Sequence, residues 1–172
     1  MVKAPSRLKQ LLEPLVIAMG YELVGMEYIG QGRRRVLRLY IDKPTGVTVD
    51  DCGRLSHQVS GVLEVEDPIP GPYTLEISSP GLDRPLFEIQ DFERFIGHKV
   101  HVKLFPQPTG SIMTEKSEHD AVSISGRSKV TGLLKGTLGA YIVVEEQGHE
   151  LVVPLERIEK ANLIPEIYQP KR

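Results

Sequence analysis

Few residues of this chain have the types and spacing that chemistry on a substrate requires. The closest pair of histidines, His98 and His101, are three apart in an expected strand and would point to opposite faces. Asp50, Ser56 and His57 could be imagined as a triad, but a helix would spread them over different faces. The sequence contains no phosphate-binding loop and no G-x-S-x-G motif. We therefore predict no catalytic, cofactor-binding or metal-binding residues, and no enzyme.

One tight basic cluster stands out, formed by Arg33, Arg34 and Arg35 with Arg38 beyond. Its position between two expected strands is typical of a solvated hairpin tip. The alternative is contact with RNA, whose phosphates draw affinity from such charges. No aromatic residues are interleaved with the arginines, so a base-stacking platform is not indicated.

The most distinctive segment is Ser78–Pro85, in which proline and glycine restrict the backbone. Pro80 and Gly81 suit the central positions of a type II turn, because glycine tolerates a positive φ. The segment could be a rigid connector, a preformed docking edge for a partner, or both. The residues that we predict to bind a partner are Ser79, Gly81, Leu82, Asp83 and Arg84.

Composition limits the class of protein. The 172 residues carry a formal charge of −2, with 26% charged and 40% hydrophobic residues, which is ordinary for a folded soluble protein. Cys52, the single cysteine, excludes an internal disulfide and falls on an apolar helical stripe, as a core thiol would. We see no membrane-spanning segment and no signal peptide, and expect a reducing, cytoplasmic location.

The first half has the pattern of an α+β domain. Apolar residues recur with helical spacing from Ser6 to Met19, although Pro14 should kink this helix or split off its first turn. Alternating residues predict strands at 21–29 and 36–41, and Thr48 can cap a second helix. A third strand at 73–78 completes an α-β-β-α-β order, with both helices on one face of a small sheet.

The second half has the pattern of a small β-barrel. Asp91 can cap a short helix, and strands are expected at 98–105, 129–136, 140–145, 150–153 and 160–164. Five short strands with tight turns suggest a barrel of Sm-like or SH3-like type. Residues 106–127 would form a long loop within it. We expect two domains, at 1–85 and 86–172, because prolines and glycines crowd the stretch before Pro85.

Several strings of residues together resemble the RimP family of bacterial ribosome maturation factors. The most specific string is Ser78-Ser79-Pro80-Gly81-Leu82-Asp83-Arg84-Pro85. The others are Leu12-Glu13-Pro14, Gly20-Tyr21-Glu22-Leu23-Val24, Leu37-Arg38-Leu39-Tyr40-Ile41-Asp42, Val49-Asp50-Asp51-Cys52, Leu75-Glu76-Ile77, Phe95-Ile96-Gly97 and Gly132-Leu133-Leu134.

The resemblance implies an α/β N-terminal domain followed by an Sm-like barrel. It also implies a non-catalytic factor that binds the immature small ribosomal subunit and assists late steps, including incorporation of small-subunit ribosomal protein twelve. A charge of −2 is too weak to hold ribosomal RNA non-specifically. We therefore expect acidic edges to recognise a basic ribosomal protein, with Arg33–Arg35 as a local RNA contact. The acidic residues are Asp50, Asp51, Glu64, Glu66 and Asp67.

Two other classes stay open. One is an enzyme with a novel site. The other is an Sm-like RNA-binding chaperone that acts as a ring, whereas a single barrel joined to another domain favours a monomer.

Overall fold

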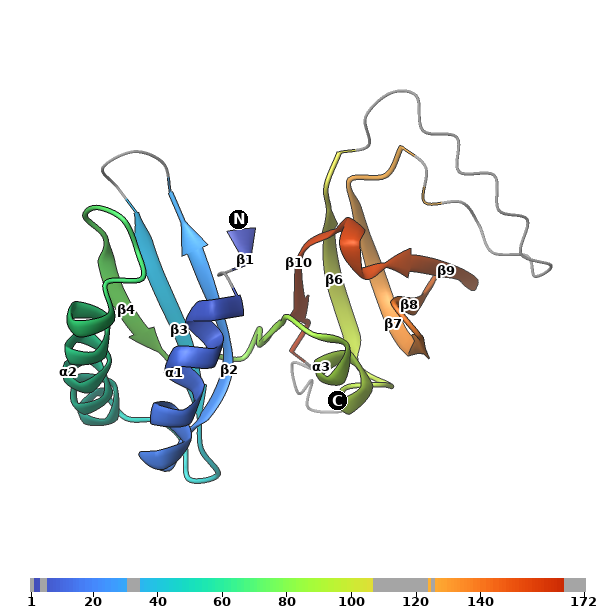
Figure 1. The fold of residues 1–172 in the computed structure, drawn as a ribbon. Coiled ribbons are helices and arrows are strands. Elements are labelled where there is room, and N and C mark those ends of the chain that lie inside the picture. The colour runs from blue at the N-terminus through green and yellow to red at the C-terminus, as the bar shows by residue number, and fades with distance from the viewer. Residues whose placement is uncertain (1, 4–5, 31–34, 107–123, 125, 166–172) are drawn as a thin grey trace. The chain divides into compact units, whose positions relative to one another are not determined.

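The computed structural model describes residues 2–3, 6–30, 35–106, 124 and 126–165, and the chain divides into two units, Met1–Gly81 and Leu82–Arg172 (Figure 1). The division falls four residues before the boundary that we expected near Pro85. The domain assignment 1–85 and 86–172 stays a prediction. Among the described helices, none is both long and apolar enough to cross a membrane.

The first unit is a sheet with two helices on one face (Figure 1). Its elements are β1 (Val2–Lys3), α1 (Ser6–Ala18), β2 (Glu22–Ile29), β3 (Val36–Asp42), α2 (Val49–Glu66) and β4 (Thr74–Ser78). The strand order is β1-β2-β3-β4. β2 pairs antiparallel with β1 and β3, whereas β3 and β4 are parallel and are joined by α2.

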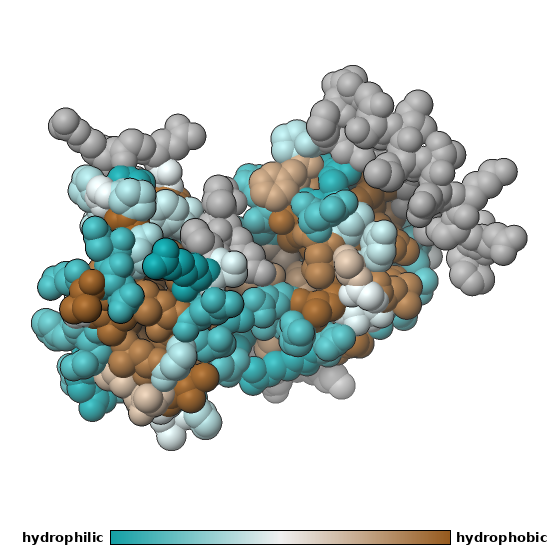
Figure 2. Space-filling view, viewed as in Figure 1, coloured by the Kyte–Doolittle hydropathy of each residue, from teal (hydrophilic) through white to brown (hydrophobic). Residues whose placement is uncertain are grey.

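The core of this unit lies between the helices and the sheet. Each of these helices and strands contributes a stripe of buried apolar side chains. These side chains recur every 3.6 residues in the helices and every two residues in the strands. The buried stripes are Leu8, Leu12 and Val16 on α1, Leu55, Val59 and Leu63 on α2, and Leu37, Leu39 and Ile41 on β3. Figure 2 shows apolar surface on the helix-covered side, bordered by hydrophilic residues. Ile17 of α1 and Val65 of α2 are exposed.

The second unit is antiparallel throughout. Its elements are β5 (Pro85–Leu86), α3 (Ile89–Arg94), β6 (Lys99–Leu104), β7 (Lys129–Leu138), β8 (Tyr141–Glu146), β9 (His149–Pro154), the 3₁₀ turn η1 (Leu155–Arg157) and β10 (Ile158–Leu163). The strand order is β5-β10-β6-β7-β8-β9. No ladder between described strands joins β9 back to the other edge, so the closed barrel that we expected is not found.

The structure confirms the mixed α+β class, and it corrects some details. β1 and β5 were not predicted, because two-residue strands carry no alternation. α1 runs unbroken past Pro14, so the first turn is not split off. Asp91 does not cap α3 as the N-cap residue, because Glu88 holds that place and Asp91 is the third helical residue of a capping box. The loop expected at 106–127 lies almost entirely outside the described residues.

Candidate functional site

The turn that follows β4 presents the residues that we predicted to bind a partner. Gly81 has φ +71°, as the proposed turn required. The turn itself is formed by Leu82 and Asp83, however, two positions later than Pro80-Gly81 would place it. Leu82 is 83% exposed, and Asp83 is exposed with no hydrogen bond or ion pair from its carboxylate to the described part of the chain. Both side chains are therefore available to a partner.

The backbone and Arg84 hold this turn against the second unit. The carbonyl of Asp83 accepts a hydrogen bond of 2.8 Å from Asn162 Nδ2, and the carbonyl of Arg84 accepts one of 2.9 Å from the backbone N–H of Leu163. The guanidinium of Arg84 lies 5.5 Å from the centre of the Phe95 ring, within cation–π range. The backbone of Asp83 and Arg84 is thus fixed, whereas the Asp83 carboxylate takes no part in these contacts.

The predicted basic cluster is only partly described. Arg33 and Arg34 lie outside the described residues, so their RNA contact stays a prediction. Arg35 is half-buried, and its Nε has no hydrogen-bond partner among the described residues. A Cβ added to Gly71 would lie only 2.5 Å from Nη2 of Arg35. Gly71 therefore leaves room for Arg35, which packs against the loop before β4 instead of standing at a solvated tip.

Arg38 does not belong to a free basic surface. The register of β2, β3 and β4 places Glu27, Arg38 and Glu76 side by side across the sheet. Arg38 Nε donates to Glu76 Oε2 at 2.7 Å, and the Tyr40 hydroxyl donates to buried Glu27 at 3.0 Å. Hydrogen bonds with Tyr40 and Glu76 raise the pKa of Arg38. The positive charge of Arg38 is therefore paired with the carboxylate of Glu76 within the sheet.

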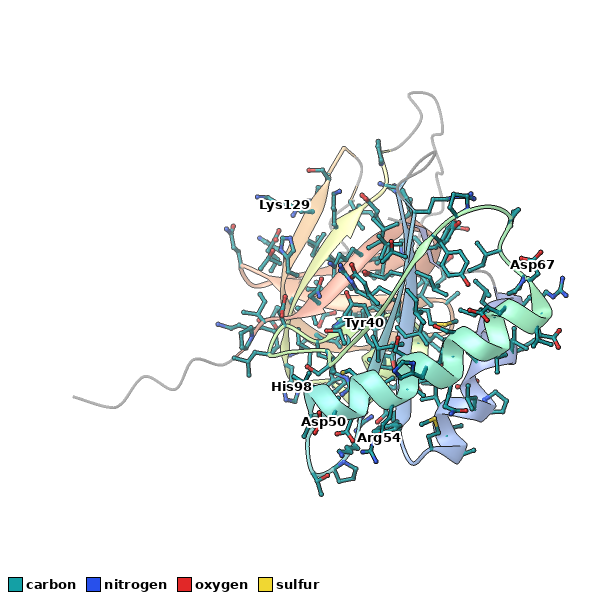
Figure 3. All side chains as sticks on the ribbon, turned by 90° about the vertical axis from the view of Figure 1, so that its left-hand side faces the viewer. Tyr40, Asp50, Arg54, Asp67, His98 and Lys129 are labelled. Atoms are coloured by element: carbon teal, nitrogen blue, oxygen red, sulfur yellow. The ribbon has the colours of Figure 1, made fainter. Side chains whose placement is uncertain are left out.

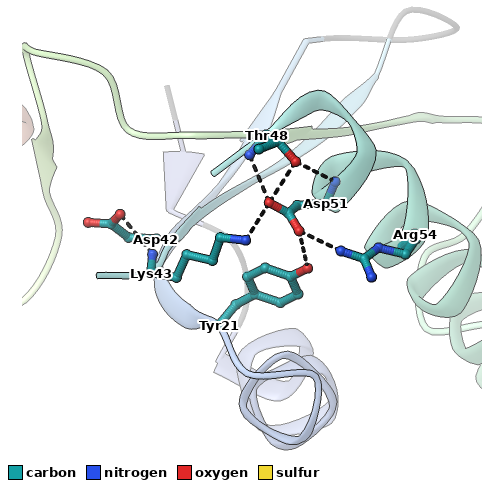
Figure 4. Close-up of polar contacts among 6 residues, drawn as sticks. All are labelled: Tyr21, Asp42, Lys43, Thr48, Asp51 and Arg54. Atoms are coloured by element: carbon teal, nitrogen blue, oxygen red, sulfur yellow. Dashed lines mark hydrogen bonds and ion pairs between the residues drawn. The ribbon is translucent and has the colours of Figure 1, made fainter. Parts of the chain in front are cut away.

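Asp51 lies at the centre of a polar cluster at the start of α2 (Figure 4). Its carboxylate is 1% exposed. Oδ1 accepts hydrogen bonds from the Tyr21 hydroxyl at 2.8 Å and from Arg54 at 2.7 Å. Oδ2 lies 2.7 Å from Lys43 Nζ and accepts hydrogen bonds of 2.8 Å from both the backbone N–H and the hydroxyl of Thr48. One carboxylate therefore joins the end of β3, the start of β2 and the first turn of α2.

These contacts hold the charged form of Asp51. The hydrogen bond from Lys43, followed by those from Thr48 and Tyr21, lowers the pKa of the carboxyl far below its usual range. Asp51 thus completes the capping box with Thr48 and positions the helix. Our expectation that it forms part of an acidic edge is wrong, because its charge is buried and already paired.

The other acidic residues of that expectation are exposed: Asp50, Glu64, Glu66 and Asp67. Figure 3 shows Asp50 and Arg54 near the start of α2 and Asp67 just beyond its end. Acidic surface therefore exists at both ends of this helix.

Residues with catalytic potential are not brought together in the described part of the chain. Within it, no group of three metal-ligating side chains is present. His98 and His101 are both exposed, and they bind different partners: the Phe95 carbonyl and the Thr131 hydroxyl. Cys52 is half-buried, because Asp51 and Leu55 take the fully buried positions of the α2 stripe, and burial raises the pKa of the Cys52 thiol.

The chain thus combines an α/β unit with an antiparallel β unit, and a fixed turn exposes an apolar and an acidic side chain. Residues 11–83 match the family model of the RimP N-terminal domain, which runs from within α1 to the exposed turn. The match covers most of the first unit and confirms the resemblance of the sequence to the RimP family. The role of the family is ribosome maturation.

Sequence reasoning missed the paired state of Asp51. Thr48 followed three residues later by an acidic residue is a capping-box signal that could have indicated it. Tyr21 and Lys43, by contrast, approach Asp51 only through the tertiary fold.

Proposed function

We propose that this protein is a non-catalytic assembly factor that binds the immature small ribosomal subunit. It acts in the cytoplasm as a monomer and assists late protein incorporation, including that of small-subunit ribosomal protein twelve. The observation that carries this proposal is the match of residues 11–83 to the RimP N-terminal domain.

The exposed acidic residues suit a basic ribosomal protein as partner. Asp83 stands on a turn whose backbone is already fixed, so little ordering is required when a partner binds. Charge complementarity of this kind mainly raises the association rate and the specificity. Leu82, exposed beside Asp83, adds an apolar contact.

The second unit supports an Sm-like interpretation through the order of its strands. The five strands lie in the order β10-β6-β7-β8-β9 in one antiparallel sheet, so that β10, the last of them in the chain, pairs with β6, the first of them in the chain. An Sm-like RNA chaperone that works as a ring is the alternative function. It would sediment as a multiple of the 19.2 kDa chain.

Co-sedimentation tests the proposed function. The purified protein is centrifuged through a sucrose gradient alone, with free small subunits, and with complete ribosomes. We expect recovery with the free small subunit well above that with complete ribosomes, and a monomer in the gradient without subunits. Equal recovery with both particles contradicts the proposal, and a ring in the protein-only gradient favours the chaperone.

Replacing Asp83 with alanine should weaken partner binding without destabilising the protein. The side chain makes no contact that folding needs, so the free energy of unfolding should change by less than about 0.5 kcal/mol. If Asp83 is one of the few residues that dominate binding, its truncation should cost more than about 1 kcal/mol, or about fivefold in affinity. The measurements are thermal melting and a pull-down with small-subunit ribosomal protein twelve.

Glu156→Ala is the matched control, because Glu156 is an exposed acidic residue of the same unit on η1. It should leave binding unchanged. If Asp83→Ala melts much earlier while its folded fraction binds normally, Asp83 is a structural residue and its assignment to the docking turn is wrong.

A further inference from the structure

One face of β6 carries only polar and charged side chains. Val100, Val102 and Leu104 are buried in the core of the second unit. Lys99, His101 and Lys103 alternate with them and are exposed. The outer face of this sheet is therefore basic along its central strand.

The register extends this basic face across three strands. In the core, Ala161 of β10 and Val130 of β7 both pair with Val102, and all three are buried. One position along, Lys160 and Lys129 both pair with Lys103. Side chains alternate between the two faces of a strand, so these three lysines share the outer face in a single row. Neighbouring strands are about 4.8 Å apart, so the row spans about 10 Å. We call it the lysine row.

The lysine row is unfavourable for the isolated fold. Like charges directly opposite each other on neighbouring strands destabilise a sheet. Lys103 is offset by Glu159, whose Oε1 lies 2.9 Å from its Nζ. Lys129 and Lys160 have no hydrogen-bond or ion-pair partner among the described residues. Lys129 and Lys160 therefore flank Lys103, whose charge is offset. Nothing in the fold requires a positive charge on this face.

Planar side chains adjoin the lysine row. Phe105 follows Lys103 by two residues and is 42% exposed. His101 precedes Lys103 by two residues and is held by a 2.8 Å contact between its Nδ1 and the Thr131 hydroxyl. Figure 3 shows Lys129 at the start of β7. Lysines beside exposed rings match what single-stranded nucleic acid presents, namely phosphates and base faces. An acidic peptide would use the lysines but not the rings.

We propose that the lysine row, with Phe105 and His101, is a contact surface for the sugar–phosphate backbone and an unstacked base of single-stranded RNA. The ammonium groups of Lys129 and Lys160 bind phosphate oxygens, and the ring of Phe105 stacks on a base. This proposal rests on the proposed function only for the source of the RNA, which would be ribosomal RNA of the small subunit.

The test measures binding of the full chain to a fluorescent twelve-nucleotide oligouridylate at several salt concentrations. Lys129→Gln with Lys160→Gln should weaken binding at least fivefold. It should also reduce the slope of log K against log salt by about 1.4, since each single-strand phosphate contact contributes about 0.7. Phe105→Leu keeps an apolar side chain but removes the stacking ring, and it should weaken binding without changing the slope.

Arg7→Gln with Lys9→Gln on α1 is the control with the same change of net charge. A melting temperature of the Lys129/Lys160 variant equal to or above that of the wild type is expected, because like-charge repulsion is relieved. The proposal is overturned if the variant and the control bind RNA alike, or if polyglutamate binds the protein more tightly than the RNA does. Because free oligonucleotide is the probe, failure here is distinct from a failure to bind small subunits.

Discussion

Replacing Gly132 with alanine should destabilise the second unit strongly. β8 passes so close to Gly132 that an added Cβ would lie 2.8 Å from the carbonyl carbon of Glu145, closer still to its oxygen, and 3.0 Å from Val144 Cγ1. The obstacle is backbone of a paired strand, which cannot rotate away as a side chain can. Forced overpacking costs about 1–3 kcal/mol, and we expect the upper part of that range. At about 4–8 °C per kcal/mol, the melting temperature should fall by 10 °C or more.

Gly136→Ala is the matched control for this prediction. Gly136 lies in the same strand, and a Cβ built on it meets nothing within 4 Å. Circular dichroism gives the melting temperatures, and hydrogen exchange of the β7 and β8 amides shows whether the loss is local to this unit. Equal melting of the two variants would mean that β8 can move away from Gly132 at little cost.

The elements of the fold were largely predictable because each carries its own period. The helices α1 and α2 fall within a few residues of their predicted positions, and so do β2 to β4 and β6 to β10. Their apolar residues recur every 3.6 residues in the helices and every two in the strands. β5 escaped prediction for a physical reason. It consists of Pro85 and Leu86 only, which is too short for an alternating pattern. Proline suits an edge strand, because its nitrogen has no hydrogen to donate to a neighbouring strand.

The partners of individual charged side chains could not be predicted, because they depend on strand register and tertiary contacts. Arg38 looked like an extension of the basic cluster, yet a neighbour 38 residues away binds its guanidinium. The lysine row has the same origin: its members lie on three strands between positions 103 and 160, and only pairing brings them together. By contrast, proline and glycine predicted a turn in this segment and the positive φ of Gly81, although the turn is formed by Leu82 and Asp83 and not by Pro80 and Gly81.

Asp51→Asn should destabilise the first unit at neutral pH. The amide cannot accept from Tyr21, Thr48, Lys43 and Arg54 together, and it leaves the Lys43 ammonium, which also lies over the Tyr21 ring, without its anion. Asp50→Asn is the control, because Asp50 neighbours Asp51 but is exposed. We expect a melting temperature clearly below that of the control and of the wild type.

The pH dependence separates the role of the Asp51 charge from that of its shape. Lys43, Thr48 and Tyr21 hold the native pKa of Asp51 well below the ordinary aspartate value of about 3.9. The unfolded chain therefore takes up this proton at a higher pH than the native chain does. Stability from Asp51 is complete well above pH 4 and is lost progressively as the pH falls below it. The gap in stability between wild type and Asp51→Asn should accordingly narrow from pH 7 towards pH 3, measured by urea unfolding. A gap that stays constant over this range would show that Asp51 acts through packing and neutral hydrogen bonds, and that its charge contributes nothing to holding α2 against β2 and β3.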